Sequence, residues 1–310
     1  MRIPMRTTAC VLLVLSIAIG TAALVGCGKT EKKPESVEQV KDEARTEKVK
    51  VGDIEVAYRV LGKGYPLVMI MGFSGTMDVW DPDALEALSR KHKVIVFDNR
   101  GTGETTAGTK QFSIKQFAID TAGFMDALEI ERAHVLGWSM GTNIAQELVL
   151  DYPDKVNKLV LYAADPGGEQ AIQPSPDVVE KMTDKSGTPE EQQKRLWETL
   201  VPMDWLETHG DYLKEIFTGP IEKVSPEAVG KQWEAIMVWP GSYDRLPQIE
   251  SQTLLLTGTE DINTPTQNSL VMVQVIPEAW LVQFKGGGHA LMYQYPEDFA
   301  SVIIDFLAAP

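Results

Sequence analysis

The residue with the clearest chemical potential is Ser139, in the middle of Gly137-Trp138-Ser139-Met140-Gly141. An apolar run precedes this Gly-x-Ser-x-Gly pattern and a helical pattern follows it, which predicts a strand, a tight turn and a helix. Such a turn holds the serine in a strained backbone conformation, and small flanking residues let strand and helix pass closely. The hydroxyl then lies beside a helix N-terminus, so the segment predicts a nucleophile for acyl transfer.

A serine needs a base to accept its proton, and the chain has four histidines. His289 follows Gly286-Gly287-Gly288, a loop mobile enough to deliver an imidazole to the serine. We expect a solvated role for His92, a structural hydrogen bond for His134, and a surface or lid position for His209. His289 is therefore the predicted base.

Composition limits the classes of partner and cofactor. The chain has 310 residues, 44% of them apolar, and a net charge of −15. This length suits one large α/β domain with an insertion, or two small domains. An acidic surface repels phosphate backbones and anionic lipid, so we expect no nucleic-acid partner. The two cysteines are Cys10 and Cys27, which excludes disulfide, zinc-thiolate and iron–sulfur sites after residue 27. We expect no cofactor or metal.

The first 26 residues have the pattern of a secretory signal, with Arg2 and Arg6 before an apolar run from Ala9 to Gly26. The run closes on Leu24-Val25-Gly26-Cys27, which resembles a bacterial lipobox. That resemblance implies a diacylated Cys27 at the mature N-terminus, and hence an exported lipoprotein anchored to a membrane of the cell envelope. The alternative is an uncleaved anchor helix, because the run approaches the length of a membrane span. Residues 27–48 are rich in charged side chains and predict a flexible tether.

From residue 49 onward, strand and helix patterns alternate. A hairpin at Val49–Val60 precedes continuous apolar runs that predict buried strands at Pro66–Met71, Lys93–Asp98, Val135–Trp138, Lys158–Ala163, Thr253–Thr257 and Trp280–Phe284. Helical patterns separate most of these runs. The alternation predicts an α/β fold with a doubly wound, mostly parallel sheet.

Residues 49–310 resemble the α/β-hydrolase superfamily. The motifs that carry the resemblance occur in the family's order: an oxyanion loop at Met69–Phe73, the turn Asp98–Gly103, the elbow at Gly137–Gly141, Pro153–Val156 after the elbow helix, an acid turn at Thr257–Asp261 and the histidine loop Gly288-His289. Two positions depart from the pattern. Met71 stands where the family often has histidine, and Thr105 where serine is usual.

The resemblance also implies the site. The family's order of serine, acid and histidine places a catalytic triad at Ser139, Asp261 and His289. Asp165, at the end of the preceding strand, is the alternative acid because some members draw the acid from there. The backbone N–H groups of Phe73 and Met140 would form the oxyanion hole.

The middle segment, about residues 166–248, interrupts the alternation and resembles the family's helical cap. Helical patterns cover Asp177–Lys185, Pro189–Leu200, Tyr212–Phe217 and Pro226–Met237. Four tryptophans lie in this segment: Trp197, Trp205, Trp233 and Trp239. We expect most of them to pack within the cap and a few to line an apolar pocket for an acyl group.

The predicted function is hydrolysis of a small carboxylic ester through an acyl-enzyme on Ser139. A lactone, an amide or a carbon–carbon bond could be cleaved by the same triad, and a cofactor-free perhydrolase would use it as well. A non-catalytic surface lipoprotein that keeps the fold is the alternative from another class. The motifs leave the oligomeric state open.

Overall fold

The computed structural model describes residues 45–184, 186–218 and 224–310, all of which belong to one unit, Ser36–Pro310. The predicted signal segment, Cys27 and most of the predicted tether lie outside the described residues. Within the described ranges, no helix has both the length and the apolar character needed to cross a bilayer.

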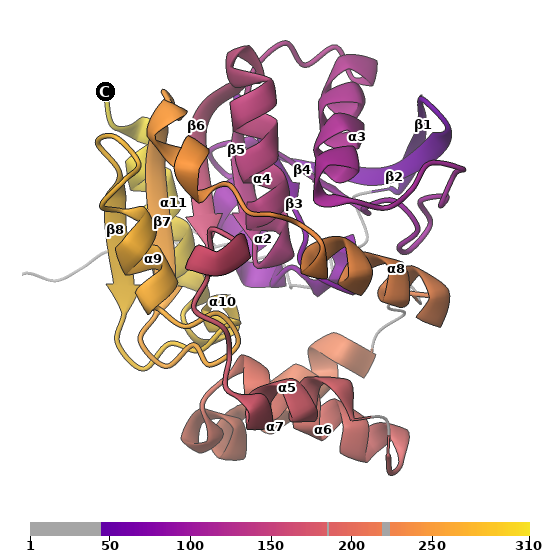
Figure 1. Ribbon diagram of the computed structural model, residues 1–310, viewed down its shortest axis with the longest axis vertical. Helices are drawn as coiled ribbons and strands as arrows, with labels where there is room; N and C mark the ends of the chain where they lie inside the picture. Colours follow the sequence, from indigo (N-terminus) through magenta and orange to yellow (C-terminus); the bar gives the residue numbers. More distant parts are fainter. Residues whose placement is uncertain (1–44, 185, 219–223) are drawn as a thin grey trace, which may run out of the picture. The chain divides into compact units, whose positions relative to one another are not determined.

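An eight-stranded sheet forms the centre of the fold (Figure 1). Its order is β1-β2-β4-β3-β5-β6-β7-β8. β2 pairs antiparallel with β1 and β4, and the remaining pairs are parallel. The prediction of a doubly wound, mostly parallel sheet is confirmed. The strands are β1 (Glu47–Val51), β2 (Ile54–Leu61), β3 (Pro66–Ile70), β4 (Lys93–Phe97), β5 (Ala133–Trp138), β6 (Val156–Tyr162), β7 (Gln252–Gly258) and β8 (Trp280–Phe284).

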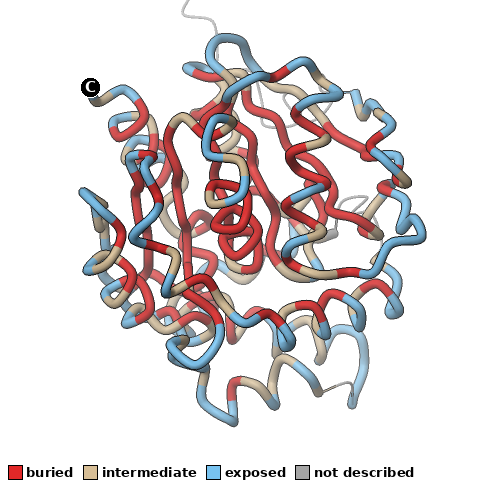
Figure 2. The backbone as a smooth tube through the Cα atoms, turned by 45° about the horizontal axis from the view of Figure 1, so that its top comes forward, coloured by how far each residue is buried: buried red, intermediate tan, exposed pale blue. Residues whose placement is uncertain are grey.

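Helices cover both faces of this sheet, so its central strands are buried throughout (Figure 2). Alternate residues of one strand enter opposite cores: Val68 and Ile70 pack in one cluster, Leu67 and Met69 in the other. One face carries α3 (Ile114–Ala127), α4 (Met140–Asp151) and α9 (Gln267–Met272), and the other carries α2 (Pro82–Ser89) and α11 (Pro296–Ala308). The continuous apolar runs in the sequence follow from this two-sided burial.

Four helices lie between β6 and β7 and form the cap: α5 (Pro176–Thr183), α6 (Pro189–Leu200), α7 (Met203–Thr218) and α8 (Pro226–Met237). Figure 1 shows α5, α6 and α7 beyond the ends toward which β6 and β8 point. α5, α6 and α8 each begin with a proline preceded by serine or threonine, a strong start signal. The cap therefore covers the carboxyl edge of the parallel sheet, where sites form in such folds.

One cap helix is longer than predicted. α7 begins at Met203 rather than Tyr212, although Gly210 lies in its interior and costs a helix about 1 kcal/mol relative to alanine. Burial of Leu206, Leu213 and Ile216 on its inner side compensates for that cost. Helical propensity is overridden here by packing against the rest of the molecule.

Polar contacts join the cap segment to the main domain. The Tyr212 hydroxyl of α7 donates to Asp81 Oδ2 at 2.6 Å. After α8, Trp239 Nε1 donates to Glu147 Oε1 of α4 at 2.8 Å, and Arg245 Nη1 donates to Glu147 Oε2 at 3.0 Å. The buried carboxylate of Glu147 is thereby paired and hydrogen-bonded, as a charge in that environment must be.

Candidate active site

Ser139 lies at the sharp turn between β5 and α4, with φ 54° and ψ −122°. The flanking glycines are required by close backbone contacts. A Cβ on Gly137 would lie 2.3 Å from the Gly141 carbonyl oxygen, and a Cβ on Gly141 would lie 2.1 Å from the carbonyl oxygen of Ile70. The Ser139 side chain makes no capping hydrogen bond to α4. This strained turn leaves the hydroxyl available to a ligand.

The loop after β3 approaches the serine closely. A Cβ on Gly72 would lie 3.1 Å from Ser139 Cβ and 3.8 Å from its Oγ, and the next residue, Phe73, lines the same cavity as Ser139. Met140 is the first residue of α4, and the N–H groups of a first helical turn have no partner inside the helix. The two residues predicted to form the oxyanion hole therefore line the same cavity as the serine.

Met71 supports this loop from below. It is 1% exposed, and its carbonyl oxygen accepts a hydrogen bond from Asn99 Nδ2 at 2.9 Å. Its sulfur lies 2.7 Å from where a Cβ on Gly75 would be. The thioether thus fills the space against Gly75. At this sequence position the family often has histidine.

Asp261 and His289 form a buried pair. His289 Nδ1 lies 3.1 Å from Asp261 Oδ1 and 3.0 Å from Oδ2. Oδ1 also accepts from the backbone N–H groups of Asn263 at 3.0 Å and Thr264 at 2.8 Å. The backbone N–H groups of Asn263 and Thr264 therefore hold the carboxylate in place. The carboxylate can then orient the imidazole.

Two glycines let the acid turn and the histidine loop touch. A Cβ on Gly258 would lie 2.0 Å from the carbonyl oxygen of Gly287, and Glu260 N donates to that oxygen at 2.9 Å. The histidine loop is also fixed to the elbow strand, because Trp138 Nε1 donates to the carbonyl oxygen of His289 at 3.1 Å. The residue adjacent to Ser139 thus contacts the backbone of the predicted base.

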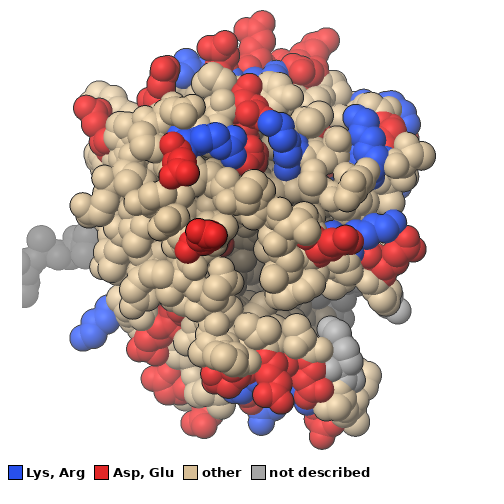
Figure 3. All heavy atoms as spheres, in the orientation of Figure 1, with Lys and Arg blue, Asp and Glu red and all other residues tan. Residues whose placement is uncertain are grey.

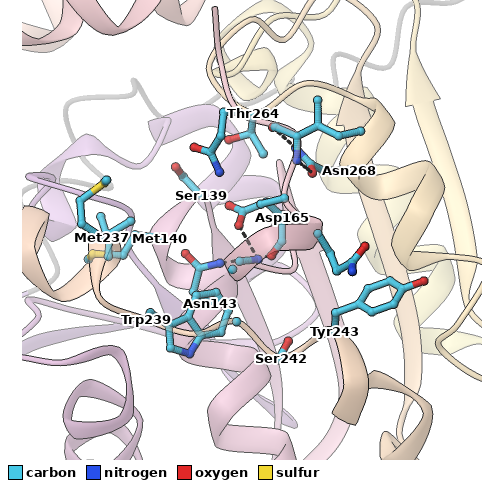
Figure 4. A pocket seen from close by; sticks show the side chains of 18 of the residues that line it. Ser139, Met140, Asn143, Asp165, Met237, Trp239, Ser242, Tyr243, Thr264 and Asn268 are labelled. Carbon is cyan, nitrogen blue, oxygen red and sulfur yellow. Dashed lines mark hydrogen bonds between the residues drawn. The ribbon is translucent and has the colours of Figure 1, made fainter.

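A cavity of about 930 Å³ opens beside Ser139 (Figure 4). Phe73, Met140, Asn143 and Asp165 line it from the main domain. Its opposite wall comes from the inserted segment and includes Val179, Met182, Trp233, Ile236, Met237 and Trp239. Its size is that of a pocket for a small organic molecule.

The sequence model of the alpha/beta hydrolase fold family matches residues 65–296, most of the chain. The chain belongs to the alpha/beta hydrolase fold family. A relative from Azorhizobium caulinodans, named as a carbamate hydrolase, RutD, is 27% identical over 256 residues, which cover 82% of this chain and 96% of the relative. The resemblance to the α/β-hydrolase superfamily is thereby confirmed.

Solved structures agree with this membership. An alpha/beta hydrolase fold protein from Chitinophaga pinensis superposes with a TM-score of 0.76 at 28% identity, covering 86% of this chain and 98% of that one. A structure described as Est816, an N-acyl homoserine lactone degrading enzyme, gives a TM-score of 0.71 at 26% identity, covering 84% of this chain and all of that one. The chain therefore spans nearly the whole of each of these α/β-hydrolases.

The other predicted acid, Asp165, lines the cavity but has different partners. Its Oδ1 accepts from Gly167 N at 2.8 Å, and its carbonyl oxygen accepts from the side chains of Asn143 and Gln146. Burial raises the pKa of Asp165, although Gly167 N–H, the Asn143 side chain and the nearby His289 oppose the shift. This α/β-hydrolase thus has a carboxyl group in the cavity beside Ser139 in addition to the Asp261 carboxylate that bonds His289.

The remaining histidines lie away from this site. The prediction of a solvated His92 is wrong, because it is 9% exposed and its ring lies 5.7 Å from that of His134. Burial lowers the pKa of both residues, that of His134 to about 4. His134 Nδ1 has no hydrogen-bond partner among the described residues. His209 stacks on Trp205 on an exposed part of α7.

Three polar residues that shape the site were not predicted from the sequence. Asn143 follows Ser139 by four residues on α4, a spacing that could have drawn attention to it. Asn268 exchanges two hydrogen bonds with the backbone of Ile172 at the cavity wall. Gln232 of α8 accepts from Ser74 N beside Phe73. The last two act across long sequence separations and have no local signal.

In the described ranges, no three His, Cys, Asp or Glu side chains are grouped closely enough to hold a metal ion.

Proposed function

We propose that this α/β-hydrolase is a serine hydrolase that cleaves a small carboxylic ester. Ser139 Oγ attacks the carbonyl carbon while His289 Nε2 accepts the hydroxyl proton, and Asp261 stabilises the imidazolium that forms. The proton then passes to the departing alkoxide and an acyl-enzyme remains. Water, activated by the same imidazole, releases the acid and restores Ser139.

The hydrogen bonds between Asp261 and His289 Nδ1 carry this proposal. They direct the Nδ1 proton to the carboxylate and leave Nε2 as the basic nitrogen. His289 is buried, and its loop is fixed to the strand that ends at Ser139. Catalytic contacts to the serine often tighten only when substrate binds.

The amides of Phe73 and Met140 support the same chemistry. Phe73 follows Gly72, which approaches Ser139 closely, and Met140 follows Ser139 at the start of α4. Donors aimed at the developing oxyanion contribute on the order of 3 kcal/mol each in enzymes of this type. We assign them to the oxyanion hole of the proposed reaction.

The cavity favours a substrate with a modest apolar group, because indole, phenyl and thioether side chains form much of its wall. A lactone is the second candidate. Its cyclic ester requires the same attack and the same oxyanion donors, and the similar Est816 is described as degrading N-acyl homoserine lactones.

We also propose that the enzyme is exported and held at a membrane of the bacterial cell envelope by lipid on Cys27. The support is the sequence pattern alone, with a charged start, an apolar run and a cysteine after Gly26. A net charge of −15 gives no electrostatic attraction to anionic lipid, so attachment would depend on the acyl chains.

The decisive experiment combines covalent labelling with kinetics. A fluorophosphonate should add one phosphonyl group to Ser139 of the wild type, located by peptide mass spectrometry, and Ser139→Ala should not be labelled. The same variant should lose at least about 10³-fold in kcat on 4-nitrophenyl butyrate. A wild type that hydrolyses neither simple esters nor lactones and takes up no label would refute the proposal and favour a non-catalytic role.

A further inference from the structure

The charged side chains of the cavity are mostly acidic. In the described residues that line it, the charged groups are Asp165, Glu169, Asp244 and Arg245. Arg245 is the only base among them, and both of its terminal nitrogens bond the Glu147 carboxylate. Its charge is therefore already neutralised by a buried partner outside the cavity lining.

Asp165 is the least exposed of these acids. It follows β6 at the carboxyl edge of the sheet and lines the same cavity as Ser139 (Figure 4). The N–H of Gly167 and the side chains of Asn143 and Gln146 fix the carboxyl group and its backbone. Gly167 cannot carry a side chain, since its Cβ would lie 2.3 Å from the Trp239 ring. The backbone N–H that holds Asp165 Oδ1 therefore comes from a residue whose surroundings leave no space for a side chain.

A nearby cation would stabilise the ionised form of the Asp165 carboxyl group. Burial raises the pKa of Asp165, which means that its ionised form is poorly solvated. A positive group in the cavity would replace part of the lost hydration, whereas a second carboxylate would add repulsion in a site of low dielectric. The neighbouring acids Glu169 and Asp244 have the same sign, but they are exposed and screened by solvent.

Aromatic rings supply a second feature that suits a cation. The Phe73 and Trp233 rings lie 5.7 Å apart with their planes at 58°, and Trp239 and Tyr243 also line the cavity. Ring faces attract ammonium groups, most strongly where water is excluded. Figure 3 shows the surface hollowed between the main domain and the cap, and acidic side chains gather on the cap below this hollow. A cation would therefore also be attracted during approach.

We infer that the cavity selects its ligand by charge, accepting an ammonium-bearing ester and rejecting a carboxylate-bearing one, with Asp165 as the selecting residue. The ester part rests on the proposed function, whereas the charge preference for a bound ligand does not. Arg245 already shares its charge with the Glu147 carboxylate, so it attracts a ligand carboxylate less than an unpaired arginine would.

The test compares three 4-nitrophenyl esters of similar acyl length: the pentanoate, the 4-(trimethylammonio)butyrate and the hydrogen glutarate. We expect kcat/KM for the cationic ester to equal or exceed that of the neutral ester, and that of the anionic ester to be at least about tenfold lower. In Asp165→Asn the ratio of cationic to anionic kcat/KM should fall at least about tenfold. Glu169→Gln changes the net charge equally, so a much smaller shift in this matched control would separate a local effect from the general field.

A binding measurement keeps the charge inference separate from the chemistry. Ser139→Ala is titrated with hexyltrimethylammonium and with hexanoate, followed by tryptophan fluorescence. Tighter binding of the ammonium ligand supports the inference even if no ester is cleaved. The absence of ester cleavage would contradict only the proposed function. Hexanoate binding as tightly as the ammonium ligand, or equal shifts in the Asp165 and Glu169 variants, would overturn the inference.

Discussion

Asp261 and Asp165 show how two similar residues near one serine acquire different roles from their surroundings. Asp261 is held by two turn amides and bonds His289 Nδ1 through both oxygens. Asp165 is half-buried at the cavity and accepts from Gly167 N. Geometry therefore favours Asp261 as the residue that orients the imidazole, which leaves Asp165 to act on the ligand.

Asp261→Asn should lower kcat on a neutral ester by up to about 10⁴-fold with little change in KM, because the amide stabilises the wrong imidazole tautomer. Asp165→Asn, the matched substitution at the alternative acid, should cause a far smaller loss of kcat. Steady-state kinetics with 4-nitrophenyl butyrate measures both. A larger loss in the Asp165 variant would make Asp165 the triad acid.

At the scale of elements, the cap helices contact the loops that carry the proposed chemistry. The end of α6 meets the histidine loop, where Ala290 N donates to the Leu200 carbonyl oxygen at 2.8 Å. Gln232 of α8 accepts from Ser74 N at 2.9 Å, and its neighbour Trp233 packs on Phe73. Ser74 has φ 56°, so the oxyanion loop holds a strained conformation that needs support from outside.

Gln232→Leu should therefore lower kcat about tenfold or more with KM nearly constant, because Ser74 N loses its acceptor and Phe73 N–H shifts. Affinity for a trifluoromethyl ketone, which mimics the tetrahedral intermediate, should fall in parallel. Glu234→Gln, on an exposed part of the same helix, is the control. If Gln232→Leu lowered only the melting temperature and left inhibitor affinity unchanged, Gln232 would be a packing residue and not a positioning residue.

At the scale of the whole molecule, the described chain is an acidic α/β-hydrolase whose described helices include none fit to cross a membrane. Its proposed attachment therefore depends on residues before the sheet begins at Glu47. Two acyl chains on one cysteine suffice for stable anchoring, whereas a single chain binds only marginally.

Bacterial cells that express the protein should incorporate radiolabelled palmitate into the wild type and not into the Cys27→Ala variant. The variant should also leave the membrane fraction, because its net negative charge offers no other attraction to lipid. Label in neither protein would contradict the lipoprotein proposal, and retention of the unlabelled variant in membranes would favour an uncleaved anchor helix.

Local patterns predicted the architecture well. Apolar runs marked the strands because both faces of the sheet are buried, and Ser-Pro or Thr-Pro pairs marked cap-helix starts because capping is a local interaction. The elbow at Ser139 was recognisable in the sequence because close backbone contacts, within a few residues and with the adjacent strand, require glycine on both sides of the serine. α7 was predicted short because its helical state depends on packing, which overrides Gly210.

The order of the elements and the identities of the candidate nucleophile, base and acids follow from local sequence, since these depend on residue type and near neighbours. The folded structure was needed to see that Asp261 pairs with His289, that Gln232 accepts from Ser74 N and that Arg245 bonds Glu147. His92 is buried in the structure, although a solvated position was predicted from the sequence. Each of these outcomes depends on side chains brought together from distant segments, and only the packing of the folded chain specifies such distances.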